Sequence, residues 1–129
     1  MPESLGEHDP SLRDIHFVVG IGLCSNMFIF LESDDVSLVD TGSGMPPNTI
    51  GAQLEQLGVK IDKVARVVLT HGHIDHIGGL AEICEHSSPI VFVHENDADD
   101  LKSFRIQSIH YMKDGDEIRL GRRDLRVLH

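Results

Sequence analysis

Three histidines and one aspartate fall within six residues near the middle of the chain, where residues 70–79 read T-H-G-H-I-D-H-I-G-G. Imidazole and carboxylate together are donors that suit Zn²⁺ and, less well, iron or manganese. His71 and His73 are two residues apart, so they point the same way in an extended or loop conformation. Asp75 and His76 come where a helix would begin and can turn toward a second centre. The loop therefore predicts a metal site, with donors for two adjacent ions.

Chance does not account for this pattern. The chain has nine histidines in 129 residues, and a chain of that composition is expected to contain His-x-His-x-Asp-His about 0.004 times. A catalytic zinc keeps about three protein ligands plus water, so two ions need about six donors, and the motif supplies four. Lone histidines at turns and strand ends are more often solvated, and five are the remaining candidates: His8, His16, His86, His94 and His110. His94 and His110 are the strongest of these, because both end or follow β segments.

A buried strand is predicted directly before the motif and would position it. Residues 64–69 form a run with three valines and no acidic residue, which is typical of a strand buried on both faces, and Thr70 follows its last residue. Leu80, Ile83 and Cys84 recur at helical spacing, so a helix is predicted from about residue 76 to residue 86, before Pro89 stops it. The motif therefore lies between a strand and a helix.

The rest of the chain predicts a sheet with helices on one face. Apolar runs at residues 15–19, 27–31 and 36–39 predict an antiparallel meander, and further elements are a helix near 48–58, a strand at 90–93 and one or two helical turns at 97–102. Turn signals at residues 114–116 and Gly121 predict a hairpin whose second strand runs to the end of the chain. Residues 1–14 lack periodicity and are expected to be a loose arm, so residues 15–129 form the domain. The predicted fold class is α+β, with a mixed, mainly antiparallel sheet.

Length and composition exclude several classes of protein. A chain of 129 residues fits one domain at most, and 40% hydrophobic residues are ordinary for a globular protein. The longest uncharged stretch, residues 17–31, is shorter than the roughly 20 apolar residues that a membrane helix needs. The acidic, polar N-terminus is the reverse of a secretory signal peptide, and Cys24 and Cys84 cannot make a disulfide framework. We therefore expect no membrane association and a cytoplasmic, reducing location.

The charge balance counts against a nucleic-acid partner. Lysine plus arginine number 11 and aspartate plus glutamate 21, and the formal net charge of −10 repels a phosphate backbone. A cluster of four arginines on the predicted hairpin is interpreted as a solvated face: Arg119, Arg122, Arg123 and Arg126. The expected partner is a small-molecule substrate.

With these residues in place, the chain resembles the metallo-β-lactamase superfamily. The family's His-x-His-x-Asp-His motif is matched at His71, His73, Asp75 and His76. The resemblance extends to Asn26 on an early strand, Asp40-Thr41-Gly42 at a strand end, Thr70-His71, Gly78-Gly79 and the closing hairpin. It covers nearly the whole chain from about residue 15.

The resemblance implies one half of a four-layer αβ/βα sandwich. The family's fold has two similar halves, and this chain is similar to the N-terminal half, so the remaining metal ligands belong to the second half. His129 aligns just before the family's next metal loop and is not itself expected to be a ligand. One sheet face would lack its cover, so we expect either self-association or an accompanying second half.

The same resemblance implies a dinuclear zinc hydrolase that acts on an ester, thioester, lactone or amide. His71 and His73 would hold one zinc ion, and Asp75 and His76 the other. Metal-activated hydroxide would be the nucleophile, and Asp75 is a candidate catalytic residue for holding it in line. Asp40 is a candidate for orienting a ligand histidine through its ring N–H, with a plain turn carboxylate as the alternative.

Three other functions stay open. Sulfur dioxygenases and flavin-linked diiron proteins of the superfamily do redox chemistry on iron, although the flavin-linked group usually carries Glu where His73 stands. Nucleases of the superfamily process tRNA or repair DNA, and the net charge of −10 counts against that function. The chain by itself could also be catalytically silent, because each metal ion would lack at least one donor.

Overall fold

A seven-stranded sheet forms the centre of the molecule. The computed structural model describes residues 2–22 and 24–128. The strands follow one another across the sheet in chain order: β1 (Glu3–Ser4), β2 (Ile15–Val18), β3 (Met27–Leu31), β4 (Val36–Val39), β5 (Val64–Val68), β6 (Ile90–His94) and β7 (Ser108–Met112). A separate hairpin consists of β8 (Glu117–Leu120) and β9 (Arg123–Arg126).

In the described residues, three α-helices and four 3₁₀ turns connect these strands. The helices are α1 (Ile50–Gln56), α2 (Ile74–Ile77) and α3 (Leu80–His86). The 3₁₀ turns are η1 (Leu5–Glu7), η2 (Pro10–Leu12), η3 (Ile61–Lys63) and η4 (Glu95–Leu101). No helix in the described part of the chain has the length and apolar character needed to cross a membrane.

The sheet is mixed, as the sequence predicts. β1 to β4 pair antiparallel, β4 to β7 pair parallel, and the hairpin adds one more antiparallel pairing, so four of the seven pairings are antiparallel. A short turn is enough to join β3 to β4, whereas each parallel pairing needs a crossover over the sheet. α1 supplies the crossover from β4 to β5, and α2 with α3 supplies the one from β5 to β6.

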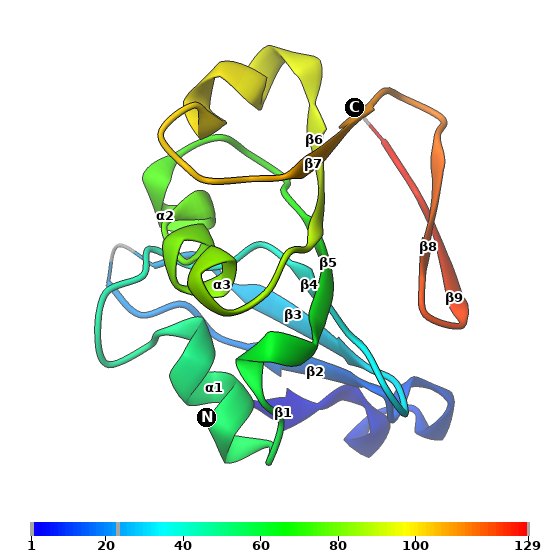
Figure 1. Ribbon diagram of the computed structural model, residues 1–129. Helices are drawn as coiled ribbons and strands as arrows, with labels where there is room; N and C mark the ends of the chain where they lie inside the picture. Colours follow the sequence, from blue (N-terminus) through cyan, green and yellow to red (C-terminus); the bar gives the residue numbers. More distant parts are fainter. Residues whose placement is uncertain (1, 23, 129) are drawn as a thin grey trace.

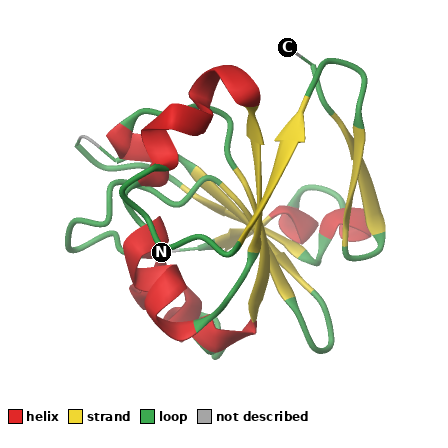
Figure 2. Cartoon of the chain, turned by 45° about the horizontal axis from the view of Figure 1, so that its top comes forward, coloured by secondary structure: helices red, strands yellow, loops and turns green. Residues whose placement is uncertain are grey.

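The α-helices cover one face of the sheet, and the hairpin lies over the other (Figure 1, Figure 2). Alternation along β3 shows the division, because Ile29 packs in the cluster under the helices while Phe30 packs in the cluster under the hairpin. Val68, Ile118 and Leu120 complete the contact between sheet and hairpin. The predicted placement of the α-helices on one face is confirmed.

Two helical expectations need correction. The helix predicted over residues 76–86 is divided into α2 and α3, because the backbone at Gly78 and Gly79 packs against the loop at residues 41–43. The helical turns predicted at residues 97–102 are a 3₁₀ stretch that begins earlier, at Glu95. In contrast, α1 lies within the predicted range and is capped by Thr49, whose hydroxyl accepts a hydrogen bond from the Ala52 N–H at 3.2 Å.

The ends of the chain also differ from the sequence predictions. Residues 2–14 are not a loose arm, because Glu3–Ser4 pairs with β2 and Leu5 packs against the hairpin side of the sheet. The second hairpin strand stops at Arg126 instead of running to the chain end. β7 has no counterpart in the prediction, since Ser108–Met112 is a largely exposed edge strand without a long apolar run.

Asp14 fastens the hairpin to the N-terminal segment, and its loss is expected to lower stability at neutral pH. Its carboxylate accepts hydrogen bonds from Arg122 and Arg123, at 3.1 and 2.9 Å, and Arg123 also reaches the Ser11 carbonyl. The bond from Arg123 holds the pKa of Asp14 well below its usual range. A group with a lowered folded-state pKa stabilises the fold above its unfolded-state pKa, and that stability is lost as pH falls.

The free energy of unfolding of the Asp14→Asn variant should therefore be about 2 kcal/mol lower than that of the wild type at pH 7. Urea titrations at several pH values should show the gap between wild type and variant closing below about pH 4. Asp124→Asn is the matched control. Asp124 forms an ion pair with Arg119, but their side chains are 62% and 63% exposed, and such exposed pairs contribute little to stability. An Asp14 effect that is no larger than the Asp124 effect would refute the fastening role.

Candidate metal centre

The motif emerges from the middle of the sheet. β5 lies between β4 and β6, and its parallel register pairs Val39 with Val68, so β4 and β5 end at the same edge. Asp40 follows β4, and its N–H donates to the Val68 carbonyl at 2.8 Å. Because parallel strands end together, Asp40 meets Thr70 although the two lie 30 residues apart in the chain.

Asp40 lies buried beneath the histidines. Its backbone has a positive φ of 62°, which few residues other than glycine adopt and which asparagine and aspartate tolerate best. Its side chain is 7% exposed and accepts three hydrogen bonds, from the Thr70 N–H at 2.8 Å, the Thr70 hydroxyl at 2.6 Å and His76 Nδ1 at 2.9 Å. The carboxylate therefore fixes both the end of β5 and the His76 ring.

The three imidazoles of the motif lie close together above Asp40. The ring centroid of His71 is 4.7 Å from that of His76 and 6.0 Å from that of His73. Two imidazoles bound to one zinc ion at about 2.1 Å and a tetrahedral angle have centroids roughly 5 Å apart. The His71–His76 spacing is near this value, whereas the His71–His73 spacing is wider. His71 and His73 are exposed.

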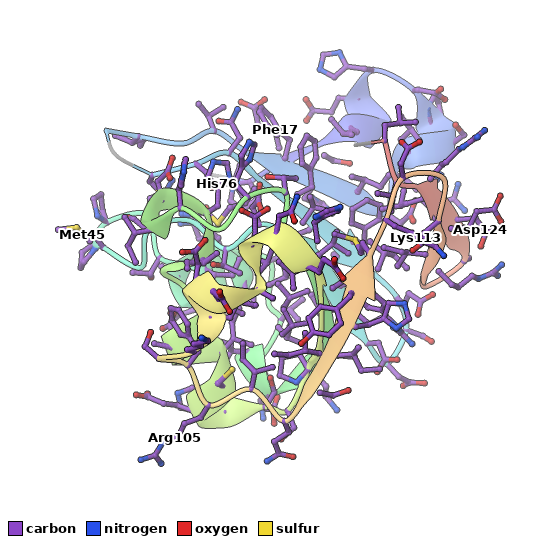
Figure 3. All side chains as sticks on the ribbon, turned by 90° about the horizontal axis from the view of Figure 1, so that it is seen from above. Phe17, Met45, His76, Arg105, Lys113 and Asp124 are labelled. Carbon is purple, nitrogen blue, oxygen red and sulfur yellow. The ribbon has the colours of Figure 1, made fainter. Side chains whose placement is uncertain are left out.

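Asp75 and His76 lie within the short helix α2. Asp75 Oδ2 lies 3.5 Å from His76 Nε2, and the Asp75 side chain is 41% exposed. The Asp75 carbonyl accepts a hydrogen bond from the Ser25 N–H at 2.9 Å, which ties the motif to the loop between β2 and β3. Figure 3 shows His76 in this region, with Met45 at the outer edge of the molecule.

The loop after β4 is hydrogen-bonded to α2. The His76 carbonyl accepts from the Thr41 N–H at 2.9 Å and from the Thr41 hydroxyl at 2.8 Å. The Thr41 hydroxyl in turn accepts from the Gly79 N–H at 3.1 Å. Thr41 is fully buried. The loop after β4 thereby holds α2 in place.

The chemistry of the donor set fits a metal ion of the zinc type, with imidazole nitrogen and carboxylate oxygen within one loop. Within residues 2–22 and 24–128, no group of three or more His, Cys, Asp or Glu side chains is arranged to hold a single ion. The motif thus brings its rings together without closing a complete ligand shell. Assignment of His71 and His73 to one ion, and of Asp75 and His76 to the other, stays a prediction.

The remaining histidines lie in other environments. His94 Nδ1 accepts from the Asn96 N–H at 3.2 Å, and the His110 ring packs on Phe92 at 5.3 Å. His16 lies on β2, where burial lowers its pKa. His129 lies outside the described residues. The sequence did not predict that the Thr41 and Thr70 hydroxyls take part in the hydrogen bonds around Asp40 and His76. The one sequence feature that could have indicated this is their position next to Asp40 and His71 at strand ends.

Comparisons with known proteins show what this chain is similar to. A model of the metallo-beta-lactamase superfamily matches residues 19–129. The probable metallo-hydrolase YflN of Bacillus subtilis is 36% identical over 72 residues, which cover 54% of this chain and 27% of that protein. Ribonuclease J of a Synechocystis species is 31% identical over 74 residues, covering 52% of this chain and 12% of that protein.

A solved structure shows the same fold. The Rm3 metallo-beta-lactamase superposes with a TM-score of 0.73 at 23% sequence identity, covering 89% of this chain and 48% of that one. The chain thus spans about half the length of that solved structure, and about a quarter of the length of YflN.

Proposed function

Because this chain belongs to the metallo-β-lactamase superfamily, we propose that it forms the metal-binding part of a hydrolase that cleaves an ester, thioester, lactone or amide. The observation that carries the proposal is the gathering of His71, His73 and His76 above the buried Asp40, with ring centroids 4.7 and 6.0 Å apart. Clustered imidazoles on a loop held by a buried carboxylate are typical of a metal centre. The superfamily match supports hydrolysis as the reaction.

Each residue of the motif has a role in the proposal. His71 and His73 would hold one ion, and Asp75 and His76 a second. When bound, two zinc ions would supply a Lewis acid for the carbonyl oxygen and lower the pKa of water toward neutrality. Asp75 is exposed enough to reach solvent, so its free carboxylate oxygen can accept a hydrogen bond from the attacking water and fix its direction.

The face under the hairpin supports a further part of the proposal. An apolar pocket between sheet and hairpin is lined by residues that include Val68, Met112 and Leu125, and it adjoins Thr70. We propose that a second half of the fold, or a second copy of the chain, covers this face and completes the ligand set. Light scattering of the 129-residue chain tests self-association; a monodisperse monomer would exclude the second copy.

Zinc titration tests the metal site directly. We expect isothermal calorimetry on the full chain to show weak zinc binding, because each ion has two donors from the motif. The His71→Ala variant should bind zinc at least about tenfold more weakly. His86→Ala is the matched control, because His86 is exposed at the end of α3. Equal affinities for wild type and His71→Ala would contradict the assignment of His71.

Iron or manganese in place of zinc would redirect the chemistry. Elemental analysis of the purified protein identifies the metal, and an iron site absorbs visible light whereas a zinc site is colourless. Iron as the resident metal would favour the dioxygenase function over hydrolysis of a carboxylic derivative.

A nuclease function is the second candidate, and the likeness to ribonuclease J favours it. The net charge of −10 opposes it, since a phosphodiester backbone is repelled by an acidic surface. Assays of thioester, lactone and RNA substrates, with a full-length protein that contains this chain, distinguish the two functions. Cleavage of RNA alone would replace the proposal.

A further inference from the structure

The Thr70 hydroxyl lies among three polar atoms of the site. Thr70 Oγ1 is 2.6 Å from Asp40 Oδ2, 3.1 Å from His71 Nδ1 and 3.3 Å from His76 Nδ1. A threonine hydroxyl has one proton to donate and two lone pairs that accept. The direction of that single proton therefore decides what the two imidazoles can do.

The proton points to Asp40. A distance of 2.6 Å is typical of an O–H group that donates to a carboxylate, and a carboxylate oxygen only accepts. The Thr70 N–H and His76 Nδ1 also face this carboxylate, at 2.8 and 2.9 Å. Its oxygens are thus occupied by donors, and the Thr70 hydroxyl keeps only lone pairs for the imidazole rings.

Both imidazoles must then carry their proton on Nδ1. His71 can bond to the Thr70 lone pair only as an Nδ1–H donor, and His76 can bond to Asp40 Oδ2 only in the same way. The lone pair of each neutral ring is left on Nε2. We infer that Thr70 is a positioning residue, which sets the tautomer of His71 and shares Asp40 with His76.

This arrangement links ligands that the proposed function assigns to two different metal ions. The Thr70 hydroxyl orients His71, the proposed ligand of the first ion. The Asp40 carboxylate orients His76, the proposed ligand of the second, and is itself hydrogen-bonded to that hydroxyl. The use of Nε2 by a metal rests on the proposed function, whereas the tautomers themselves do not. His73 makes no such contact with Thr70 among the hydrogen bonds of the described residues.

Nitrogen NMR of the metal-free chain tests the inference. Long-range proton–nitrogen correlations on uniformly ¹⁵N-labelled full chain, recorded where the imidazoles are neutral, report which ring nitrogen carries the proton. We expect His71 and His76 in the Nδ1–H tautomer alone. His86, exposed at the end of α3, serves as the reference ring that samples both tautomers.

Variants at Thr70 separate a positioning role from a structural one. Thr70→Val removes the hydroxyl at similar volume and keeps the backbone bond from Thr70 to Asp40, so His71 should lose its single tautomer while His76 keeps it. Thr70→Ser should restore the wild-type pattern for both rings. If Thr70→Val does not fold, as judged by its amide spectrum, Thr70→Ala removes the same hydroxyl without placing a methyl group against the carboxylate.

Two results would overturn the inference. The first is a wild-type His71 that populates the Nε2–H tautomer, and the second is a folded Thr70→Val or Thr70→Ala variant in which His71 stays entirely Nδ1–H. Because these spectra are recorded without metal, they stand whether or not zinc binds or a substrate is cleaved. Absence of zinc binding with the expected tautomers would instead count against the proposed function alone.

Discussion

Replacing Gly78 by alanine is expected to remove about 3 kcal/mol or more from the free energy of unfolding, because the new methyl group would collide with backbone. A Cβ at this position would lie 2.0 Å from the Ser43 carbonyl oxygen and 2.3 Å from the Ser43 carbonyl carbon. Gly78 has φ −59° and ψ −29°, which suit any residue, so the loss is purely steric. Neither loop can withdraw, since Thr41 bonds to His76 and Gly79.

Gly58→Ala provides the matched control for this experiment. Gly58 has a positive φ of 72°, but a Cβ there would meet nothing within 4 Å, so that variant carries only the conformational cost of about 1 kcal/mol. Urea unfolding of both variants measures the difference. If Gly78→Ala is no less stable than Gly58→Ala, then the two loops are not packed as closely as the structure shows.

Replacing Asp40 by alanine is expected to cost about 3 kcal/mol of stability and to release the histidines. The substitution removes the acceptor of three partly buried hydrogen bonds, from the Thr70 N–H, the Thr70 hydroxyl and His76 Nδ1, and each such bond contributes about 1 kcal/mol. Alanine also tolerates the φ of 62° less well than aspartate. Thermal unfolding, together with zinc titration, measures both consequences.

Asp40→Asn separates stability from the orientation of the ligand. Asparagine tolerates the same backbone and its amide oxygen still accepts from the Thr70 N–H, so most of the stability should be retained. Its NH₂ group, however, donates where the carboxylate accepted, which favours the opposite tautomer of His76. We expect zinc affinity about tenfold lower with a nearly unchanged fold. Full zinc affinity in Asp40→Asn would show that Asp40 is only a turn carboxylate.

Local patterns in the sequence were sufficient for the strands and the donor set. β2 to β6 lie where short apolar runs with β-branched residues predict them, because such runs are typical of buried strands. The motif at residues 70–79 likewise contains its donors in one continuous segment. Neither inference needs knowledge of a distant residue.

The sequence failed where an element owes its form to a partner far along the chain. The edge strand β7 forms because the edge of β6 is open to it, although its own residues are mostly exposed. The N-terminal segment is ordered by pairing with β2 and by Asp14 with Arg123, which lie 109 residues apart. No local periodicity reports such pairings.

Two features could thus be predicted from local sequence: the four donors, whose types and spacing favour a metal, and the strand that precedes them. The way in which these donors are held could be seen only in the folded chain. The parallel register of β4 and β5 brings Asp40 to Thr70, and the backbone packing of Gly78 against Ser43 interrupts the helix. These contacts join residues that lie 30 or more positions apart in the chain, so their approach depends on the whole packed sheet and on no local propensity of either segment.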